Sequence, residues 1–363
     1  MHVVRLGLAV ALCASSVLAF GRGSSSKAVP PSVGRHSRAS SLQNVQSAPA
    51  SPSKRWVRPI TSYGDPDLQG VWMNNRATPL ERPKALEGRP ILTDAEVAVL
   101  QQRADKLFKN GNSDYAVGDA VFLAAFANLA EYNNAAATAS SFLTLNTVFD
   151  NRTALIVDPP DGRLPPMTAE AQQRRKAVAT ARAAALEQGR AAPKDLSNSL
   201  RCITWGTPRL LISPYTSHYQ IIQAPGYVVL YLEADVRIIP VNGHPHLKSS
   251  LKALLGDSRG RWEGNTLVVD TTNFSPKSDF MGSSEHLHLV ERFTRVSQDT
   301  INYDITIDDP TTWTRPWTVE IRLARTDDTL YEDACHEGNY EVMRGMLAAP
   351  RVEEKAEGEI GVK

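Results

Sequence analysis

The chain has 363 residues, with 40 Lys and Arg against 39 Asp and Glu. This balance gives no reason to expect a nucleic acid or an acidic membrane surface as a partner, and we expect neither. The length allows one large domain or two ordinary ones with ample core, and the 42% hydrophobic content is ordinary for a globular protein.

The first residues carry the three-part pattern of a secretory signal peptide. Arg5 precedes the apolar run Leu6–Leu12, and Val17–Ala19 provides a small-residue cleavage site. The apolar run is shorter than the roughly 20 residues that a membrane span needs. We therefore expect residues 1–19 to be a signal peptide, export to the periplasm or the cell exterior, and no transmembrane segment after signal removal.

Composition divides the rest of the chain. Residues 20–64 are rich in Ser, Ala, Pro and Arg, and they bury too little apolar surface to offset their ordering entropy, which predicts a disordered linker. Residues 65–200 mix helical and strand patterns. Residues 201–347 read as strands, and we expect residues 348–363 to form a flexible tail.

Helix signals lie in the first half of the folded part. Thr93 with Glu96 three residues later forms a capping-box pattern, which predicts a helix ending near Lys109. Thr168 predicts the start of a second, largely exposed helix that continues to about Arg190. Part of residues 119–139 also has a helical composition.

The second half is dominated by strand signals. Gly264-Asn265 and Gln298-Asp299 are short polar turns between β-branched and aromatic runs, which predicts two hairpins. Other connections are also too short for crossovers, so the sheet should be antiparallel. The predicted strands are Arg209–Ser213, Tyr219–Gln223, Tyr227–Glu233, Arg237–Val241, Thr266–Thr271, His286–Val296, Thr300–Ile307, Trp317–Leu323 and Leu330–Cys335.

These patterns predict a mainly β fold with accessory helices (α+β). We expect the C-terminal half to form an antiparallel β-barrel or sandwich, because many short strands joined by short turns favour closure. Gly70 and Trp72, on a predicted first strand, resemble the Gly-x-Trp start of a lipocalin-like barrel.

Longer motifs carry a second resemblance. RTALIVDPPDGRLPP at 152–166, GDSRGRWEGNTLVVDTTNF at 256–274 and YEDACHEGNY at 331–340 resemble an uncharacterised family of exported bacterial proteins. The resemblance covers most of the chain from Asp67 to about Lys355. It implies export and a β-rich fold, and it supplies no catalytic residues.

Cysteine usage agrees with export. Of the three cysteines, Cys13 would leave with the signal peptide, and Cys202 and Cys335 would remain. An even count in an oxidising compartment predicts one disulfide, while two free buried thiols are the alternative.

Four residues are candidates for acid–base catalysis. His336 and Glu337 follow an apolar run, and His286 and His288 share one face of a predicted strand. The His-x-His pairs resemble cupin metal sites superficially, but the required Glu spacing is missing, so we expect no metal and no cofactor.

The leading hypothesis for function is binding of a small, apolar molecule inside the barrel; a lyase, isomerase or hydrolase that uses the His/Glu pair is the alternative. A structural envelope protein is a third possibility. The ligand, the reaction and the oligomeric state are left open. Aromatic side chains on strands and two arginines near the Trp262 turn are the candidate ligand contacts: Tyr227, Tyr231, Trp262, Arg259, Arg261, Tyr303 and Trp317.

Overall fold

The computed structural model describes residues 56–108, 119–129, 147–188, 191–210, 217–278, 280–330 and 332–347. The chain divides into two units, Met1–Lys54 and Arg55–Lys363, and all described residues belong to the second. The predicted signal peptide and C-terminal tail, and most of the predicted linker, lie outside the described residues. Residues 56–64 make defined contacts, among them a β-bridge between Ile60 and Pro66.

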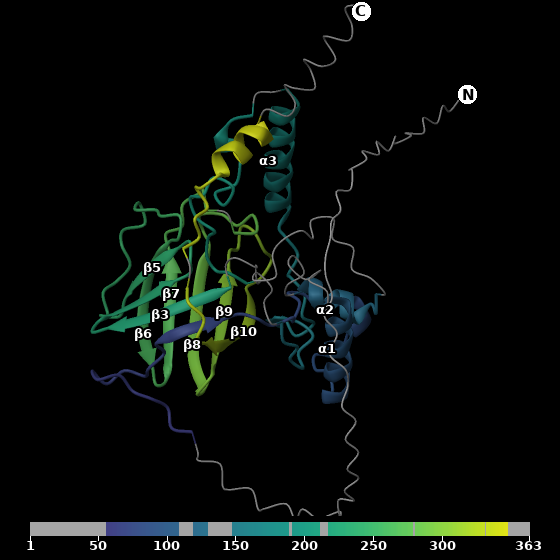
Figure 1. The fold of residues 1–363 in the computed structure, drawn as a ribbon. Coiled ribbons are helices and arrows are strands. Elements are labelled where there is room, and N and C mark those ends of the chain that lie inside the picture. Colours follow the sequence, from purple (N-terminus) through teal and green to yellow (C-terminus); the bar gives the residue numbers. More distant parts are fainter. Residues whose placement is uncertain are drawn as a thin grey trace, which may run out of the picture. The chain divides into compact units, whose positions relative to one another are not determined.

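One antiparallel sheet of ten strands forms the main part of the fold (Figure 1). Its order is β5-β4-β3-β1-β10-β9-β8-β7-β6, and β2 also pairs with β10. The first strand of the chain therefore lies in the middle of the sheet, between β3 and β10. The strands are β1 Gly70–Met73, β2 Ile156–Asp158, β3 His218–Ala224, β4 Tyr227–Tyr231, β5 Val236–Pro240, β6 Asp257–Glu263, β7 Thr266–Thr272, β8 His288–Ser297, β9 Thr300–Asp308 and β10 Trp317–Thr326.

Both predicted hairpins are present. Gly264 has a φ of +60° in the β6–β7 turn, a conformation that glycine adopts without steric cost. The β8–β9 hairpin turns at Gln298 and Asp299, where Ser297 pairs with Thr300. Burial alternates along β8, β9 and β10, so one face of each strand packs into the core and the other faces outward.

The sheet curls until its two edge strands approach each other. Arg237 of β5 bonds to Glu291 of β8, although six strand positions separate these strands in the sheet, a span of roughly 29 Å if the sheet were flat. A Cβ added to Gly260 of β6 would lie 2.9 Å from a methyl of Val241, just after β5.

The sheet is nevertheless open rather than closed. Among the described residues, no backbone ladder joins β5 to β6, so the prediction of a closed lipocalin-like barrel is not met. Two features fit an open seam. The two edge strands are joined by the long connection 241–256 instead of a tight turn, and Pro240, at the end of β5, has no N–H to donate.

The concave side of the sheet is filled by side chains. Its core cluster includes Ile221 and Leu230 from one half of the sheet and Leu289 and Ile305 from the other, each at most 1% exposed. Phe293 stacks on Tyr303 with ring centroids 4.2 Å apart. Curling thus produces a packed centre.

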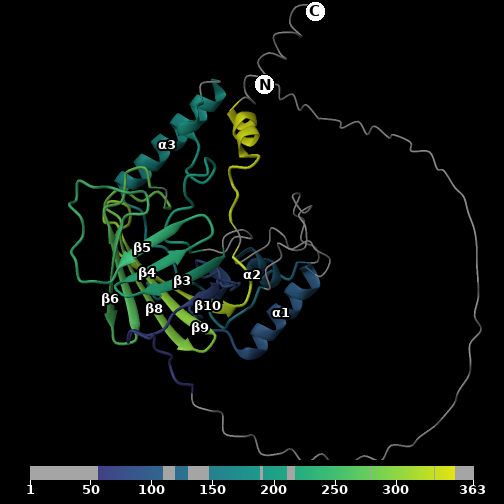
Figure 2. The ribbon, with the colours of Figure 1, turned by 60° about the vertical axis from the view of Figure 1, so that its left-hand side comes forward.

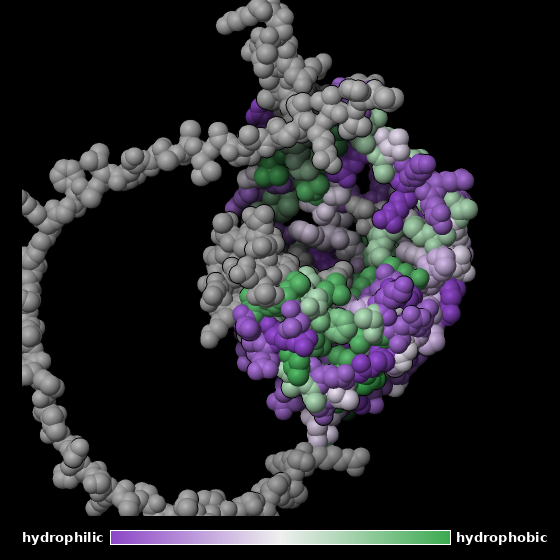
Figure 3. All heavy atoms as spheres, turned by 90° about the vertical axis from the view of Figure 1, so that its right-hand side faces the viewer, coloured by the Kyte–Doolittle hydropathy of each residue, from purple (hydrophilic) through white to green (hydrophobic). Residues whose placement is uncertain are grey.

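Helices form the remaining elements (Figure 2). They are α1 Asp94–Phe108, α2 Asp119–Phe126, α3 Ala169–Glu187, two 3-10 turns, Lys84–Leu86 and Pro193–Asp195, and a short helix over residues 339–347. The first two build a smaller core with Phe149, and Figure 3, seen from the side where they lie in Figure 1, shows hydrophobic patches broken by hydrophilic residues. None of the helices in the described ranges is long and apolar enough to cross a membrane.

The predicted helix starts are confirmed. Thr93 Oγ1 accepts from the Glu96 N–H at 3.3 Å, and the Thr93 N–H donates to the Glu96 carboxylate at 2.8 Å. Thr168 Oγ1 accepts from the Ala171 N–H at 3.1 Å, and only Ala171 of α3 is buried, as expected for an exposed helix. Beyond α2, most of the predicted helical stretch 119–139 lies outside the described residues.

Two predicted strands are not formed as expected. Residues 332–335 are irregular, because the Ala334 and Cys335 N–H groups donate to carbonyls two residues back, at 3.1 and 2.8 Å. Arg209 and Leu210 are also not in a strand, and the rest of that predicted strand is outside the described residues.

Candidate functional site

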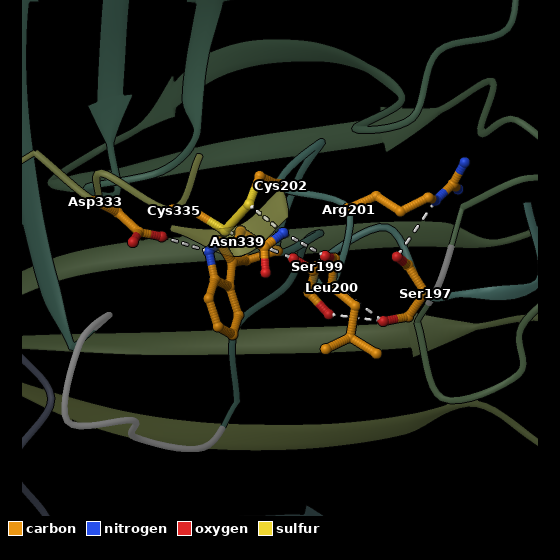
Figure 4. Close-up of a disulfide and its surroundings, with 9 residues drawn as sticks. Ser197, Ser199, Leu200, Arg201, Cys202, Asp333, Cys335 and Asn339 are labelled. Atoms are coloured by element: carbon orange, nitrogen blue, oxygen red, sulfur yellow. Dashed lines mark hydrogen bonds between the residues drawn. A yellow bond between two sulfur atoms is a disulfide. The ribbon is translucent and has the colours of Figure 1, made fainter. Parts of the chain in front are cut away.

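A disulfide joins two loops that are far apart in the sequence. Cys202 and Cys335 are bonded across a separation of 133 residues, with their Cα atoms 5.6 Å apart, so the predicted pair is confirmed. Asn339 donates to the Leu200 carbonyl at 2.7 Å and to Cys202 Sγ at 3.1 Å (Figure 4). The bond and these contacts hold the C-terminal segment against residues 199–202.

A buried carboxylate holds the next part of the first loop. Asp235, in the β4–β5 turn and 5% exposed, accepts from Thr204 Oγ1 at 2.6 Å and from the Trp205 N–H at 3.0 Å. Arg209 donates to the same carboxylate at 2.9 Å. The loop is therefore fixed both to the β4–β5 turn and to the C-terminal segment.

These three segments surround a cavity of about 360 Å³, which we call the disulfide pocket. The volume lies at the lower end of the ~300–1,000 Å³ usual for ligand sites. Its lining combines both halves of the disulfide with aromatic, acidic and imidazole side chains, among them Trp205, Tyr231, Glu233, Glu332, Asp333 and His336. Trp205 Nε1 donates to Asp333 at 2.6 Å, which fixes the indole at the pocket wall.

Glu233 is the unusual member of this lining. Its side chain is only 9% exposed, and His218 Nδ1 donates to its Oε1 at 3.1 Å. Its second oxygen, Oε2, is buried and has no hydrogen-bond partner within the described part of the chain. The hydrogen bond to Glu233 raises the pKa of His218, while burial opposes this and the charges of Glu233 and Asp328 add to it.

Backbone strain accompanies this geometry. Glu233 has a φ of 63° and Cys202 a φ of 54°, both in the left-handed region that non-glycine residues rarely occupy. Such residues cost of order 1–3 kcal/mol each and cluster at functional sites. Two of them thus line one pocket of this protein.

A second polar group lies on the sheet where the long 241–256 connection meets β6 and β7. His246 contacts Asp257 at 3.0 Å and Asp270 at 2.9 Å through its two ring nitrogens, and His288 Nε2 contacts the other oxygen of Asp270 at 3.0 Å. The hydrogen bond between His288 and Asp270 raises the pKa of His288 and lowers the pKa of Asp270. All of these nitrogens have carboxylate partners, which leaves the group little capacity for a ligand.

The third polar group is enclosed in the sheet. Arg237 donates from Nη1 to Glu291 Oε1 at 2.9 Å and from Nη2 to Glu291 Oε2, and Tyr303 also donates to this carboxylate. Ser258 and Thr271 accept from Arg237 Nη2 at 3.0 and 3.1 Å. Burial, and secondarily the charge of Glu291, raises the pKa of Tyr303 well above its ordinary value.

A larger pocket, of about 630 Å³, is lined by Trp56, Arg295 and Arg325 with Asp67 and Asp299. Arg295 donates to the carbonyls of Asp67, Ser297 and Gln298. Its donors therefore serve to hold loops together. We place the candidate site at the smaller pocket, whose lining combines aromatic side chains with carboxylates and an imidazole.

The four predicted catalytic residues fall into separate groups. His336 lines the disulfide pocket, and Glu337 is exposed in the adjacent turn. His288 belongs to the Asp270 group, and His286 is exposed just before β8. No hydrogen bond between the described residues joins the first pair to the second. Within the same described ranges, no group of three or more His, Cys, Asp or Glu side chains is arranged to hold a metal ion.

The predicted ligand contacts are similarly divided. Tyr231 lines the disulfide pocket, whereas Tyr227 on the same strand is 46% exposed on the outer face. Tyr303 and Trp317 are core residues, and Trp262 packs partly buried against that core. Arg259 pairs with Asp257 at 3.0 Å and Arg261 with Glu263 at 2.7 Å, so each guanidinium has a local carboxylate.

Sequence reasoning missed the central residues of the pocket, Glu233 and Trp205. A local signal existed for Glu233, because Glu233-Ala234-Asp235 is an acidic turn after an aromatic strand. Nothing local links it to Trp205, which lies 28 residues earlier in the chain and reaches the pocket through Asp235.

Comparison of the chain with known protein families, with curated proteins and with solved structures finds no match. The function must therefore be argued from the geometry of the disulfide pocket.

Proposed function

We propose that this protein binds a small molecule in the disulfide pocket. The observation that carries the proposal is the cavity of about 360 Å³, whose lining combines the aromatic side chains of Trp205 and Tyr231 with carboxylates and the imidazole of His336.

The lining also favours a ligand with an apolar part. Trp205 and Tyr231 offer aromatic faces, and Trp205 remains 40% exposed although its Nε1 is already bonded. An amphipathic molecule, with a polar end at the polar side chains of the lining and an apolar body on these rings, fits this arrangement. The proposal moves the site from the middle of the sheet, which side chains fill, to the edge of the β4–β5 turn.

We further propose that the protein works outside the cytoplasm. The signal-peptide pattern predicts export, and the Cys202–Cys335 bond is of the kind that persists in oxidising compartments. The resemblance to a family of exported proteins agrees with this location.

Acid–base catalysis by the predicted His/Glu pair has less support. His336 and Glu337 are both exposed. His288 lies on a different strand, β8, and His286 just before it. A general acid and base must reach one substrate within hydrogen-bonding distance, and these two pairs belong to separate groups of contacts.

The proposal can be tested with three probes that share a phenylethyl body and differ in their polar group: 2-phenylethylamine, 2-phenylethanol and 3-phenylpropanoate. Binding is followed by nuclear magnetic resonance through the indole N–H signal of Trp205, which the Trp205→Phe variant identifies among the six tryptophans. We expect at least one probe to shift this signal in a saturable manner.

Two tyrosines of β4 provide a matched pair of variants. Tyr231→Ser should weaken probe binding about fivefold, since one aromatic contact contributes about 1 kcal/mol. Tyr227→Ser, which alters an exposed ring on the same strand, should leave binding unchanged. If none of the probes shifts the Trp205 signal, or if both variants weaken binding equally, the disulfide pocket is not the binding site.

A further inference from the structure

The outward-facing side chains of the sheet differ between its two halves. On the outer face of β8 and β9, Arg292 pairs across the strands with Asp304, and both side chains alternate with buried core residues. On β3, β4 and β5 the row of the same kind consists of Ile222, Val229 and Ile238. One half of the sheet therefore turns charged side chains outward, and the other half turns apolar ones outward.

The apolar half has a continuous surface, which we call the outer apolar face. It consists of six residues in register on three neighbouring strands: Ile222, Tyr227, Val229, Tyr231, Val236 and Ile238. The residues that alternate with them, such as Val228 and Ile239, are buried in the core. Strands with apolar residues on both faces are typical of sheets that are covered on both faces.

The outer apolar face is nevertheless uncovered in the single chain. Four of its side chains, those of Ile222, Tyr227, Val236 and Ile238, are 43–64% exposed. Large side chains present about 150–250 Å² each when they are fully exposed, so the six together leave on the order of 500 Å² uncovered. Apolar patches of roughly 300–600 Å² are the largest that monomers usually expose, and they often mark an interaction site.

The shape and charge of the face fit a second copy of the same chain. Of the six residues, only Tyr231 lines either of the pockets described above, so the face is mainly a sheet surface. Two sheets pack face to face when their twists match, and the same three strands of a second copy have the same twist. A two-fold axis places the same patch on both sides, and a patch without charge meets no like charge there.

We propose that two copies of this protein pack their outer apolar faces against each other in a two-fold symmetric dimer. This inference goes beyond small-molecule binding in the disulfide pocket and does not depend on it. Two such faces bury on the order of 1,000 Å² before the rim is counted, close to the ~1,200 Å² lower limit of specific interfaces. The dimer is therefore expected to be weak, with a dissociation constant in the micromolar range.

Sedimentation velocity of the purified protein measures this association. Between about 1 µM and about 300 µM we expect a reversible shift from monomer to dimer. Methyl nuclear magnetic resonance identifies the surface involved. The signals of Ile222 and Ile238 should shift over the same concentration range, whereas those of Val178 on α3 should stay unchanged.

A matched pair of variants tests the assignment. Ile238→Lys places a charge on the face twice in each dimer, and it should weaken association at least about tenfold because the charge is buried without a partner. Val178→Lys adds the same charge on α3, at a residue that is 65% exposed against 64% for Ile238, and it should leave association unchanged. Ile222→Lys is a second variant of the face and should act like Ile238→Lys. Matching thermal unfolding midpoints would show that all three variants fold.

Three results would overturn the proposal. If the wild-type protein stays monomeric over the whole concentration range, a second copy does not cover the face, and a different partner is its occupant. If Ile238→Lys and Ile222→Lys associate as tightly as the wild type, the dimer forms through another surface. If Val178→Lys weakens association as much as they do, the effect comes from added charge in general and not from the outer apolar face.

Discussion

Two groups of charged side chains connect segments in the same part of the sheet, and one group is buried while the other is half-exposed. In the first, Arg237 of β5 meets Glu291 of β8, and both side chains are almost completely buried, with 3% and 0% exposure. In the second, Asp270 of β7 meets His246 and His288, with side chains that are 28–40% exposed. Both groups connect β7 or β8 with the segment around the open β5–β6 seam.

The comparison shows how burial changes the role of an ion pair. A buried charge that loses its partner cannot be rehydrated without opening the fold, so removing either partner strongly destabilises the protein. A half-exposed charge that loses its partner is hydrated by solvent instead, at a small cost in stability. The Arg237–Glu291 pair should therefore hold the curled sheet in one arrangement, while the Asp270 group should mainly respond to pH.

The largest effect is expected from Glu291→Ala. It leaves the buried Arg237 guanidinium without its carboxylate, and breaking such a pair costs about 3–5 kcal/mol. Urea unfolding followed by circular dichroism measures this loss. A loss below about 1 kcal/mol would mean that water hydrates the Arg237 guanidinium, and that the seam between β5 and β6 is more accessible to solvent than the structure indicates.

A combined variant serves as the control for that prediction. Arg237→Met, Glu291→Leu and Tyr303→Phe together remove both charges and the hydroxyl that depends on them. Apolar replacements of buried pairs are often neutral or stabilising, so this variant should regain most of the stability that Glu291→Ala loses. If the variant does not regain this stability, the hydrogen bonds of the network stabilise the protein by more than the neutralisation of the two charges.

A smaller effect is expected from Tyr303→Phe. The ring keeps its stacking on Phe293, but the hydrogen bond to the Glu291 carboxylate is lost. Hydrogen bonds to charged groups contribute about 1.5–3 kcal/mol, and the same unfolding measurement applies. An unchanged stability would show that the hydroxyl does not hold the carboxylate.

Asp270→Asn should cost less than either buried change. It weakens the contacts with His246 and His288, and exposed pairs contribute about 0.2–1 kcal/mol each. Added salt should reduce this difference further, because exposed pairs are screened. A loss comparable with that of Glu291→Ala would overturn the distinction between the two groups.

The pH dependence of the Asp270 group gives the smallest expected effect. The pKa of His288 is raised above its ordinary 6.5, so its contribution to stability is complete below pH 6.5 and is lost as pH rises through the raised pKa. The pKa of Asp270 is lowered from 3.8, so its contribution is present above pH 3.8 and is lost as pH falls through the lowered pKa. His288→Gln should flatten the alkaline side of the stability profile.

The sequence predicted those features that depend on neighbouring residues. The Thr93 and Thr168 caps and the turns at Gly264 and Gln298 are local patterns that tertiary packing did not override. Leu330–Cys335 was predicted as a strand, and its described residues 332–335 are irregular because the disulfide and local turns hold their backbone.

The candidate site was only partly predictable. Tyr231, His336 and the cysteine pair were identified as candidates, and they do line one pocket. Trp317 and Tyr303 were named for the same aromatic character, but they fill the core, because residue type alone does not say which face of a curled sheet turns inward. Glu233 was marked only by its acidic turn, and its burial against His218 is a contact that the tertiary structure creates.

The sequence by itself determined the antiparallel strands, the helix starts and the pairing of the only two cysteines beyond the signal-peptide pattern, because each is encoded by residues close together or by a count. Only the tertiary structure decided that β1 inserts between β3 and β10, that Arg237 reaches Glu291, and that Trp205 and Glu233 line one pocket. These contacts join distant segments whose meeting depends on how far the whole sheet curls, and local patterns carry no information about that curvature.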